Sequence, residues 1–217
     1  MTPNRMKSLI FLFIGALILL SHPGEAQFWK RKKDKTTRKI DSKDTKTRSE
    51  FYFIEGMRYF VLEDYDKAKS NFEKVLEIDP NLAAAHYKIA DLYLIQGQAM
   101  KAMPYAKKAL ELDAKNKAYY LLLARVYEFL QDYQRAAITL KDLIENVEGA
   151  KEHYFDLALI QTYLEDYEGA LETYDKVLEY FGASSEVMQQ KQRLLLRLNR
   201  LDEAVLVGQD MIKSFPE

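Results

Sequence analysis

Carboxylates beside tyrosines are the first residues in this sequence whose spacing suggests chemistry. The stretch LEDYDKA at 62–68 returns as LEDYEGA at 164–170 and more loosely as LQDYQRA at 130–136. Neighbouring carboxylates such as Glu63 and Asp64 can act as a general acid and base when their pKa values are tuned. The later copies, however, lie 68 and 102 residues after the first, and both offsets are multiples of 34. The acidic residues therefore follow a sequence repeat, which indicates a structural role.

The remaining candidates for chemistry are three histidines. His86 and His153 have neither a second imidazole nor a spaced carboxylate set beside them in the sequence, and His22 lies near the N-terminus. The chain has no cysteine, which excludes disulfides and thiolate zinc sites. It also has no glycine-rich phosphate loop and no nucleophile elbow. We expect a protein without enzymatic activity, cofactor or metal ion.

A period of 34 residues, counted from Ser49, organises most of the chain. Position 8 of the period is mostly small, and position 20 is always alanine, at Ala68, Ala102, Ala136, Ala170 and Ala204. Small residues allow two helix backbones to approach, while larger residues at positions 11, 24 and 27 fill the space beside them. Such units become stable by stacking on their neighbours. The pattern predicts a solenoid over 49–217, with repeats at 49–82, 83–116, 117–150, 151–184 and 185–217.

The small and aromatic residues of this pattern resemble the tetratricopeptide repeat signature. In the first repeat they are Tyr52, Gly56, Tyr59, Ala68, Phe72 and Pro80. The resemblance implies an all-α fold, a right-handed α-solenoid of five 34-residue helix-turn-helix repeats, and a non-enzymatic scaffold for protein–protein interaction. Gln161 and Gln192 stand where small or apolar residues are expected, and we expect them to weaken the packing.

The acidic residues of the repeated LEDY stretch fall at the turn between the two helices of a repeat. Asp64, Asp132 and Asp166 all occupy position 16. An aspartate at the start of a helix accepts hydrogen bonds from free backbone N–H groups and favours the positive end of the helix dipole. We therefore expect these three residues to cap the second helix of their repeats.

The resemblance also implies a concave groove lined by the first helix of each repeat, which would hold a peptide or helix of a partner protein. Carried over position by position, the groove residues are Phe53, Met57, Tyr87, Asp91, Leu121, Arg125, Phe129, Phe155, Leu159 and Arg193, and the same correspondence includes Glu128 and Tyr163. Phe53 has an alternative role, which is packing against the adjacent repeat. Because positions 5 and 9 lack lysine and asparagine, a clamp for a partner's C-terminal carboxylate is disfavoured.

The first 48 residues differ physically from the solenoid. Arg5 and Lys7, an apolar run at 9–20 and small residues before Gln27 predict a signal peptide over 1–26 and export to the periplasm or cell envelope. The alternative is an uncleaved N-terminal anchor. Residues 27–48 carry 10 Lys+Arg against 3 Asp, which predicts a flexible basic linker. Its residues 28–48 would meet an anionic membrane surface, and no specific nucleic acid is expected.

The fifth repeat ends at Phe215-Pro216-Glu217, and no following repeat covers its apolar residues. Solenoids usually close with a helix whose outer face is polar. We expect either that the natural chain continues or that a second copy covers this end, giving a homo-oligomer. The alternative function is therefore a structural unit that self-associates through its C-terminal repeat, or an adaptor tethered to a membrane at its N-terminus.

Overall fold

A computed structural model describes residues 43–216, and every regular element in that range is helical. The chain divides into two units, Met1–Phe51 and Tyr52–Glu217. The predicted signal peptide and residues 27–42 of the predicted linker lie outside the described residues. Residues 43–48, however, were predicted to be flexible and are helical. The Thr47 hydroxyl donates to the Lys43 carbonyl at 2.9 Å, and Lys46 pairs with Glu50 one turn later, so local contacts favour a helix there.

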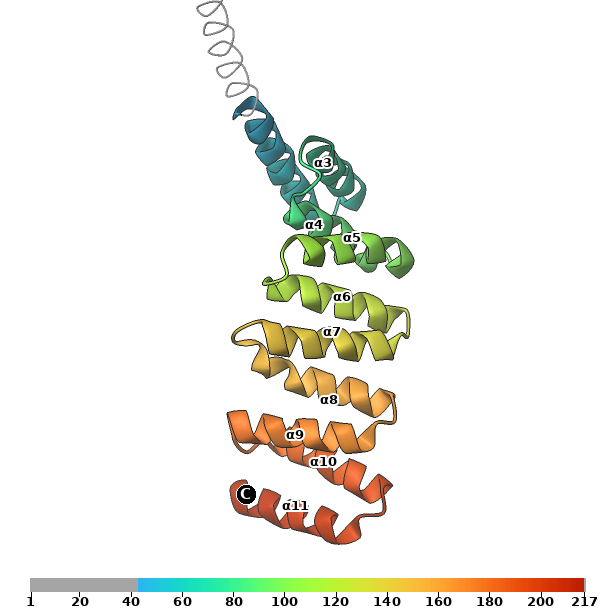
Figure 1. The fold of residues 1–217 in the computed structure, drawn as a ribbon, viewed down its shortest axis with the longest axis vertical. Helices are drawn as coiled ribbons and strands as arrows, with labels where there is room; N and C mark the ends of the chain where they lie inside the picture. The colour runs from blue at the N-terminus through green and yellow to red at the C-terminus, as the bar shows by residue number, and fades with distance from the viewer. Residues whose placement is uncertain (1–42, 217) are drawn as a thin grey trace, which may run out of the picture. The chain divides into compact units, whose positions relative to one another are not determined.

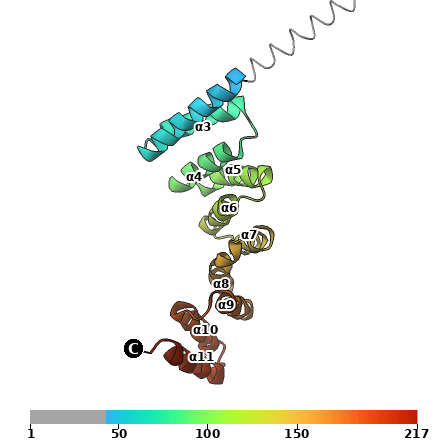
Figure 2. The same ribbon diagram turned by 90° about the vertical axis from the view of Figure 1, so that its left-hand side faces the viewer.

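The second unit is a series of helices that lie side by side in chain order (Figures 1 and 2). Residues 52–61 are helical and are followed by α3 (Tyr65–Ile78), α4 (Ala83–Ile95), α5 (Ala99–Leu112), α6 (Lys117–Phe129), α7 (Tyr133–Asn146), η1 (Ala150–His153), α8 (Tyr154–Tyr163), α9 (Tyr167–Phe181), α10 (Ser185–Arg197) and α11 (Leu201–Ser214). Each helix from α3 to α11 packs against its neighbours in the chain. The predicted fold class, an all-helical solenoid of helix pairs, is confirmed.

The turns within the pairs confirm the capping prediction. The side chains of Asp64, Asp132 and Asp166 accept hydrogen bonds from the backbone N–H three residues later, at 3.3, 3.2 and 3.1 Å. The residue before each aspartate adopts a left-handed conformation, with φ of 57° at Glu63 and Gln131 and 59° at Glu165. The repeated stretch thus forms a tight helix–helix turn in all three of its copies.

Two turns lack this cap. The N-cap residues of α5 and α11 are Gln98 and Arg200, and neither makes a side-chain capping bond. The residues before them, Gly97 and Asn199, still have positive φ values of 70° and 57°. Glycine and asparagine tolerate this conformation best, so the turn keeps its shape without the aspartate.

Small residues allow the close approach of helices, as the sequence predicts. The alanines at position 20 are all buried. Gly56 shows the constraint most clearly, because a Cβ added to it would lie 2.7 Å from the ring of the buried Phe72. The largest core cluster runs from α4 to α8 through the middle of the solenoid, and smaller clusters lie on either side of it.

The two glutamines that interrupt the apolar pattern were expected to weaken the packing, and the structure gives them hydrogen-bond partners instead. Gln161 donates to Asp166 at 3.3 Å and accepts from the Thr173 hydroxyl at 2.7 Å. Gln192 donates to the carbonyl of Ala204 at 3.0 Å. Each glutamine therefore connects the two helices of its repeat. Both face a glycine on the opposite helix, Gly169 and Gly208, where a Cβ would meet the amide nitrogen at 2.7 and 2.8 Å.

Candidate functional site

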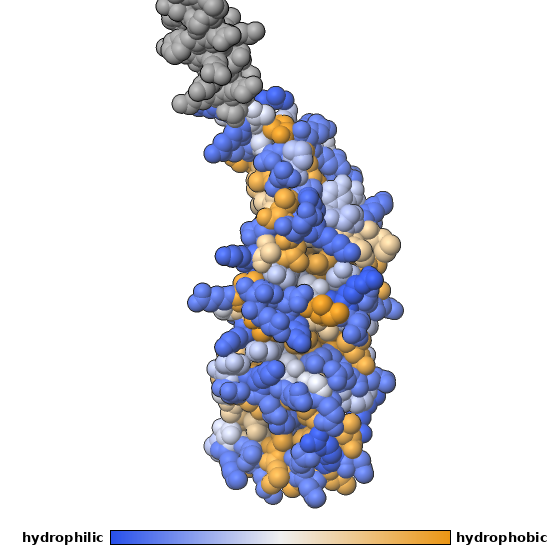
Figure 3. All heavy atoms as spheres, viewed as in Figure 1, coloured by the Kyte–Doolittle hydropathy of each residue, from blue (hydrophilic) through white to orange (hydrophobic). Residues whose placement is uncertain are grey.

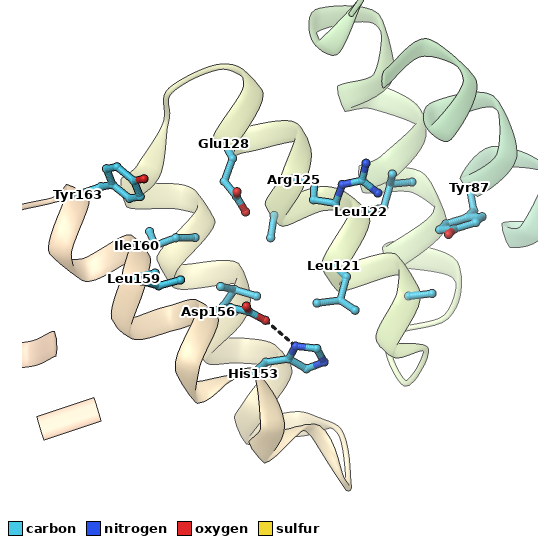
Figure 4. A pocket seen from close by; sticks show the side chains of 13 residues that line it. Tyr87, Leu121, Leu122, Arg125, Glu128, His153, Asp156, Leu159, Ile160 and Tyr163 are labelled. Atoms are coloured by element: carbon cyan, nitrogen blue, oxygen red, sulfur yellow. Dashed lines mark hydrogen bonds and ion pairs between the residues drawn. The ribbon is translucent and has the colours of Figure 1, made fainter. Parts of the chain in front are cut away.

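A cavity of about 510 Å³ lies between the first helices of consecutive repeats, α4, α6 and η1–α8, in the middle of the second unit (Figure 4). Its floor is apolar and is formed by leucines and an isoleucine from α6 and α8. Charged groups and two tyrosines stand around that floor. The labelled lining residues in Figure 4 are Tyr87, Leu121, Leu122, Arg125, Glu128, His153, Asp156, Leu159, Ile160 and Tyr163.

The cavity brings together four of the ten residues that the sequence assigns to the groove. They are Tyr87 from α4, Leu121 and Arg125 from α6, and Leu159 from α8. Glu128 and Tyr163, which the same correspondence includes, also line it. The central part of the expected groove is thus one continuous hollow.

The other six residues do not line this cavity. Phe53 makes an edge-to-face contact with Phe72, with ring centroids 5.4 Å apart, and Met57 packs on the same core cluster. Phe155 packs on the core beside Tyr174, at 5.9 Å. These three side chains support the contact between helices, which is the alternative role that the sequence left open for Phe53. Asp91, Phe129 and Arg193 lie outside the lining, with Phe129 and Arg193 exposed.

The end of the cavity at α4 is aromatic and cationic. Tyr87 packs against Tyr119 with ring centroids 5.3 Å apart. Burial is the main cause that raises the pKa of the Tyr87 phenol, and the charge of Asp91 raises it further, while Arg125 opposes both. The phenol therefore stays neutral near physiological pH and offers a ring face and a hydroxyl group to a ligand.

The end of the cavity at α8 is anionic. Burial raises the pKa of the Glu128 carboxyl, the charge of Asp156 raises it further, and Arg125 lowers it. The Nδ1 atom of His153 lies 2.8 Å from Asp156 Oδ2. Its Nε2 atom is buried and lies 3.4 Å from Glu152 Oε1 without the geometry of a hydrogen bond. Two carboxylates thus share one region of the cavity.

His153 and Asp156 line the cavity, although the groove predicted from the sequence does not include them. The repeat register places them at positions 3 and 6, whereas the groove prediction rests on positions 2, 5, 9, 12 and 13. His153 lies in the 3₁₀ segment η1, where about three residues per turn replace the spacing of an α-helix, whereas Asp156 lies in the first turn of α8. Leu122 of α6, also at position 6, lines the cavity as well. The three-residue spacing of His153 and Asp156 is the sequence signal that could have indicated their contact within one helical turn.

The lining chemistry suits recognition. A carboxylate that holds an imidazole can orient it as a base, but the residues that line this cavity include no serine, cysteine or lysine that His153 would activate. Within residues 43–216, no group of three His, Cys, Asp or Glu side chains is placed to hold a metal ion.

Comparison with known proteins identifies the family. Models of the tetratricopeptide repeat match residues 49–82, 71–103 and 121–187, which together cover more than half of the chain. The chain belongs to the tetratricopeptide repeat family. Its fold is consistent with a protein–protein interaction scaffold, and proteins of this family are generally non-enzymatic. No curated protein sequence matches the chain at a significant level.

Solved structures of tetratricopeptide repeat proteins share the fold at low sequence identity. A crystal structure of MamA protein is 22% identical, with a TM-score of 0.67, and the alignment covers 76% of this chain and 91% of that one. YrrB, described as "a TPR protein with an unusual peptide-binding site", is 18% identical, with a TM-score of 0.65 and coverage of 83% and 92%. A tetratricopeptide repeat protein from Parabacteroides merdae is 18% identical, with a TM-score of 0.67 and coverage of 79% and 68%.

Proposed function

We propose that this protein is a non-enzymatic interaction scaffold that binds a peptide or helix of a partner protein at the cavity between α4, α6 and α8. The observation that carries the proposal is the hollow itself, with an apolar floor and charged groups around it. Its volume of about 510 Å³ lies in the range of ligand pockets, roughly 300–1,000 Å³. A few well-placed polar groups around an apolar floor provide specificity, while burial of the partner's side chains provides affinity. YrrB is a precedent for a peptide site on this fold.

Paired variants test the proposal. The purified full chain is crosslinked in extracts of its source cells, and captured proteins are compared between wild type and Tyr87→Ala/Leu121→Ala. The control is Ile138→Ala/Tyr180→Ala, which removes two exposed side chains outside the cavity. We expect the cavity variant to lose specific partners that the control retains, with both variants keeping a helical circular dichroism spectrum. Equal recovery by all three proteins would remove the cavity from the function.

We also propose that the protein is exported to the periplasm or cell envelope. The support is the basic start, the apolar run and the small residues at Gly24 and Ala26 in the sequence. Within residues 43–216, no helix is long and apolar enough to cross a membrane. Sequencing of the mature N-terminus tests the proposal, because Gln27 is expected as the first residue. An intact Met1 on a membrane-bound chain would favour the uncleaved anchor.

A specific observation favours self-association as a second function. Helix α11 leaves large apolar side chains exposed, and Ile212 is 71% and Leu206 58% accessible. A second hollow of about 490 Å³ lies between α10 and the end of α11 and is lined in part by Met211, Ile212 and Phe215. Figure 3 shows apolar surface at this end of the unit. Light scattering at increasing protein concentration should show dimers that Ile212→Asp abolishes, and a constant monomer mass for wild type would exclude this function.

A further inference from the structure

The two carboxylates at the α8 end of the cavity form no ion pair with a lysine or arginine in the described part of the chain, and only the charge of Arg125 partly offsets that of Glu128. Glu128 and Asp156 come from different helices, and both point into the hollow (Figure 4). Among residues 43–216, no lysine or arginine lies within ion-pair distance of either carboxylate, and the only ion-pair partner of Asp156 is His153. Two like charges at a half-buried site destabilise each other unless a cation arrives.

An exposed aromatic ring lies at the C-terminal end of α8. Tyr163 lines the cavity about two helical turns after Asp156 and is 69% accessible, although its ring is held in place by stacking on Tyr133 at 5.3 Å. A fixed ring face attracts a lysine or arginine side chain through its quadrupole. The two carboxylates thus complement a cationic group, and the aromatic face offers a further contact for a basic segment along α8.

The rest of the cavity determines which group of a ligand must lie next to the cation. Leu121, Leu159 and Ile160 form an apolar floor beside the carboxylates, and Arg125 stands toward the opposite end, near Tyr87 (Figure 4). Arg125 would repel a cation at the α4 end, so the charges of the cavity favour one orientation of a bound ligand. A ligand would place its positive group at α8 and an apolar group over the leucines.

We propose that the cavity binds a partner segment in which a lysine or arginine lies next to a large apolar residue. The cation lies between Glu128 and Asp156, and the apolar side chain covers Leu121 and Leu159. This inference rests on the proposed function and specifies the chemistry of the partner. The acidic site faces a positive group, in contrast to a clamp for a terminal carboxylate.

The test is selection from a library of random ten-residue peptides on the purified full chain. Selected peptides are measured by fluorescence anisotropy with wild type, with Glu128→Gln/Asp156→Asn, and with the control Glu172→Gln/Glu179→Gln. The control changes the net charge equally on exposed residues of α9 outside the cavity. We expect wild type to select lysine or arginine beside an apolar residue. The cavity variant should bind these peptides on the order of tenfold more weakly, and the control within about twofold of wild type.

A second set of binding measurements tests whether the loss of affinity comes from the contact between the peptide's basic residue and the two carboxylates. Replacing the basic residue of a selected peptide with glutamine should weaken binding to wild type by a similar factor and have little further effect on Glu128→Gln/Asp156→Asn. Selected peptides that bind the cavity, as judged by loss with Leu121→Ala/Leu159→Ala, but have no basic preference would overturn this inference and leave the proposed function standing. If Leu121→Ala/Leu159→Ala weakens the binding of no selected peptide, both this inference and the proposed function are wrong.

The chain's own basic segment is the competing occupant. A synthetic peptide of residues 28–42 is therefore measured beside the selected peptides. Weaker binding of this peptide than of the selected ones supports a separate partner. Tighter binding that is lost with Glu128→Gln/Asp156→Asn would show that the chain binds its own N-terminal segment, and the inference of a separate partner would be overturned.

Discussion

Helices α6 and α11 have 13 and 14 residues, yet they differ sharply in how much of them is buried. Helix α6 buries seven residues, including Tyr120, Leu123 and Tyr127, whereas α11 buries only Ala204. The difference follows from their neighbours, because α6 packs against α4, α5 and α7, while α10 is the main contact of α11. In a solenoid, stability is a sum over interfaces between neighbours. The central repeats, which form the cavity, therefore gain more stabilisation from their neighbours than α11 does.

The largest predicted effect is the difference in unfolding free energy between leucine-to-alanine substitutions in the central repeats and in α11. Leu140 on α7 is 2% accessible, so Leu140→Ala leaves a cavity and should lower the free energy of unfolding by about 2–5 kcal/mol. Leu206→Ala on α11 removes an exposed side chain and should change it by less than about 0.5 kcal/mol. Chemical denaturation followed by circular dichroism measures both. Similar losses in the two variants would break the comparison.

A smaller contrast should appear at two helix glycines. In Gly56→Ala, the new methyl group would collide with the Phe72 ring inside the core, so we expect a loss of about 1–3 kcal/mol. In Gly208→Ala on α11, the group in the way is the end of the Gln192 side chain, and alanine favours the helix by about 1 kcal/mol. The net change should lie within about 1 kcal/mol. Thermal unfolding of both variants gives the answer, and a larger loss at Gly208 would show that the end is as tightly packed as the rest.

The caps should give a still smaller difference. Asp166→Ala removes the acceptor for the Gly169 N–H and should cost about 1 kcal/mol, while Asp166→Asn keeps an acceptor and should cost less. At the uncapped α5, Gln98→Asp should add stability of about 0.5 kcal/mol. Denaturation midpoints test these signs. A destabilised Gln98→Asp would mean that the left-handed Gly97 turn does not place the side chain as the other turns do.

The smallest predicted effect is a pH dependence of folding stability that arises from the ionisation of Glu128 in the cavity. The pKa of Glu128 is raised above its ordinary 4.5, so ionisation is less favourable in the folded protein than in the unfolded chain. The resulting loss of stability is absent below about pH 4, grows as pH rises through the raised pKa, and is complete at neutral pH. Glu128→Gln should therefore be slightly more stable than wild type at pH 7 and lose that advantage at low pH. An advantage that grows on acidification would contradict this assignment.

The fold was predictable because the sequence repeats its constraints. Five alanines at one position and aspartates at the turns each specify the same local geometry, so errors in one repeat are corrected by the others. Residues 43–48 escaped prediction because their composition suggests a solvated chain, while the stabilising contacts, such as the Thr47 bond to Lys43, are local details.

The site was only partly predictable. The position of a residue in the repeat determines which face of the helix its side chain lies on, but not which side chains it contacts there. Tyr87, Leu121, Arg125 and Leu159 face one hollow, as the register predicts. Phe53, at the same position as Tyr87, instead meets Phe72 across the space that Gly56 leaves open. The place of His153 depends on the 3₁₀ segment η1, which no periodic pattern predicts, whereas Asp156 shares position 6 with Leu122, another lining residue that the groove prediction did not include.

The bonded glutamines have a consequence for assembly during folding. Similar repeats present similar surfaces, and a helix can dock on the wrong neighbour, which is a characteristic failure of repeat proteins. Gln161 bonds to Asp166 and Thr173, and a docking that offers no such groups would bury its amide without a partner. Helix α7 carries Asp132 and Thr139 at the same two repeat positions, and Gln192 needs only a backbone carbonyl, that of Ala204. The two glutamines therefore disfavour misaligned packing within a helix pair, but they do not distinguish one repeat from another.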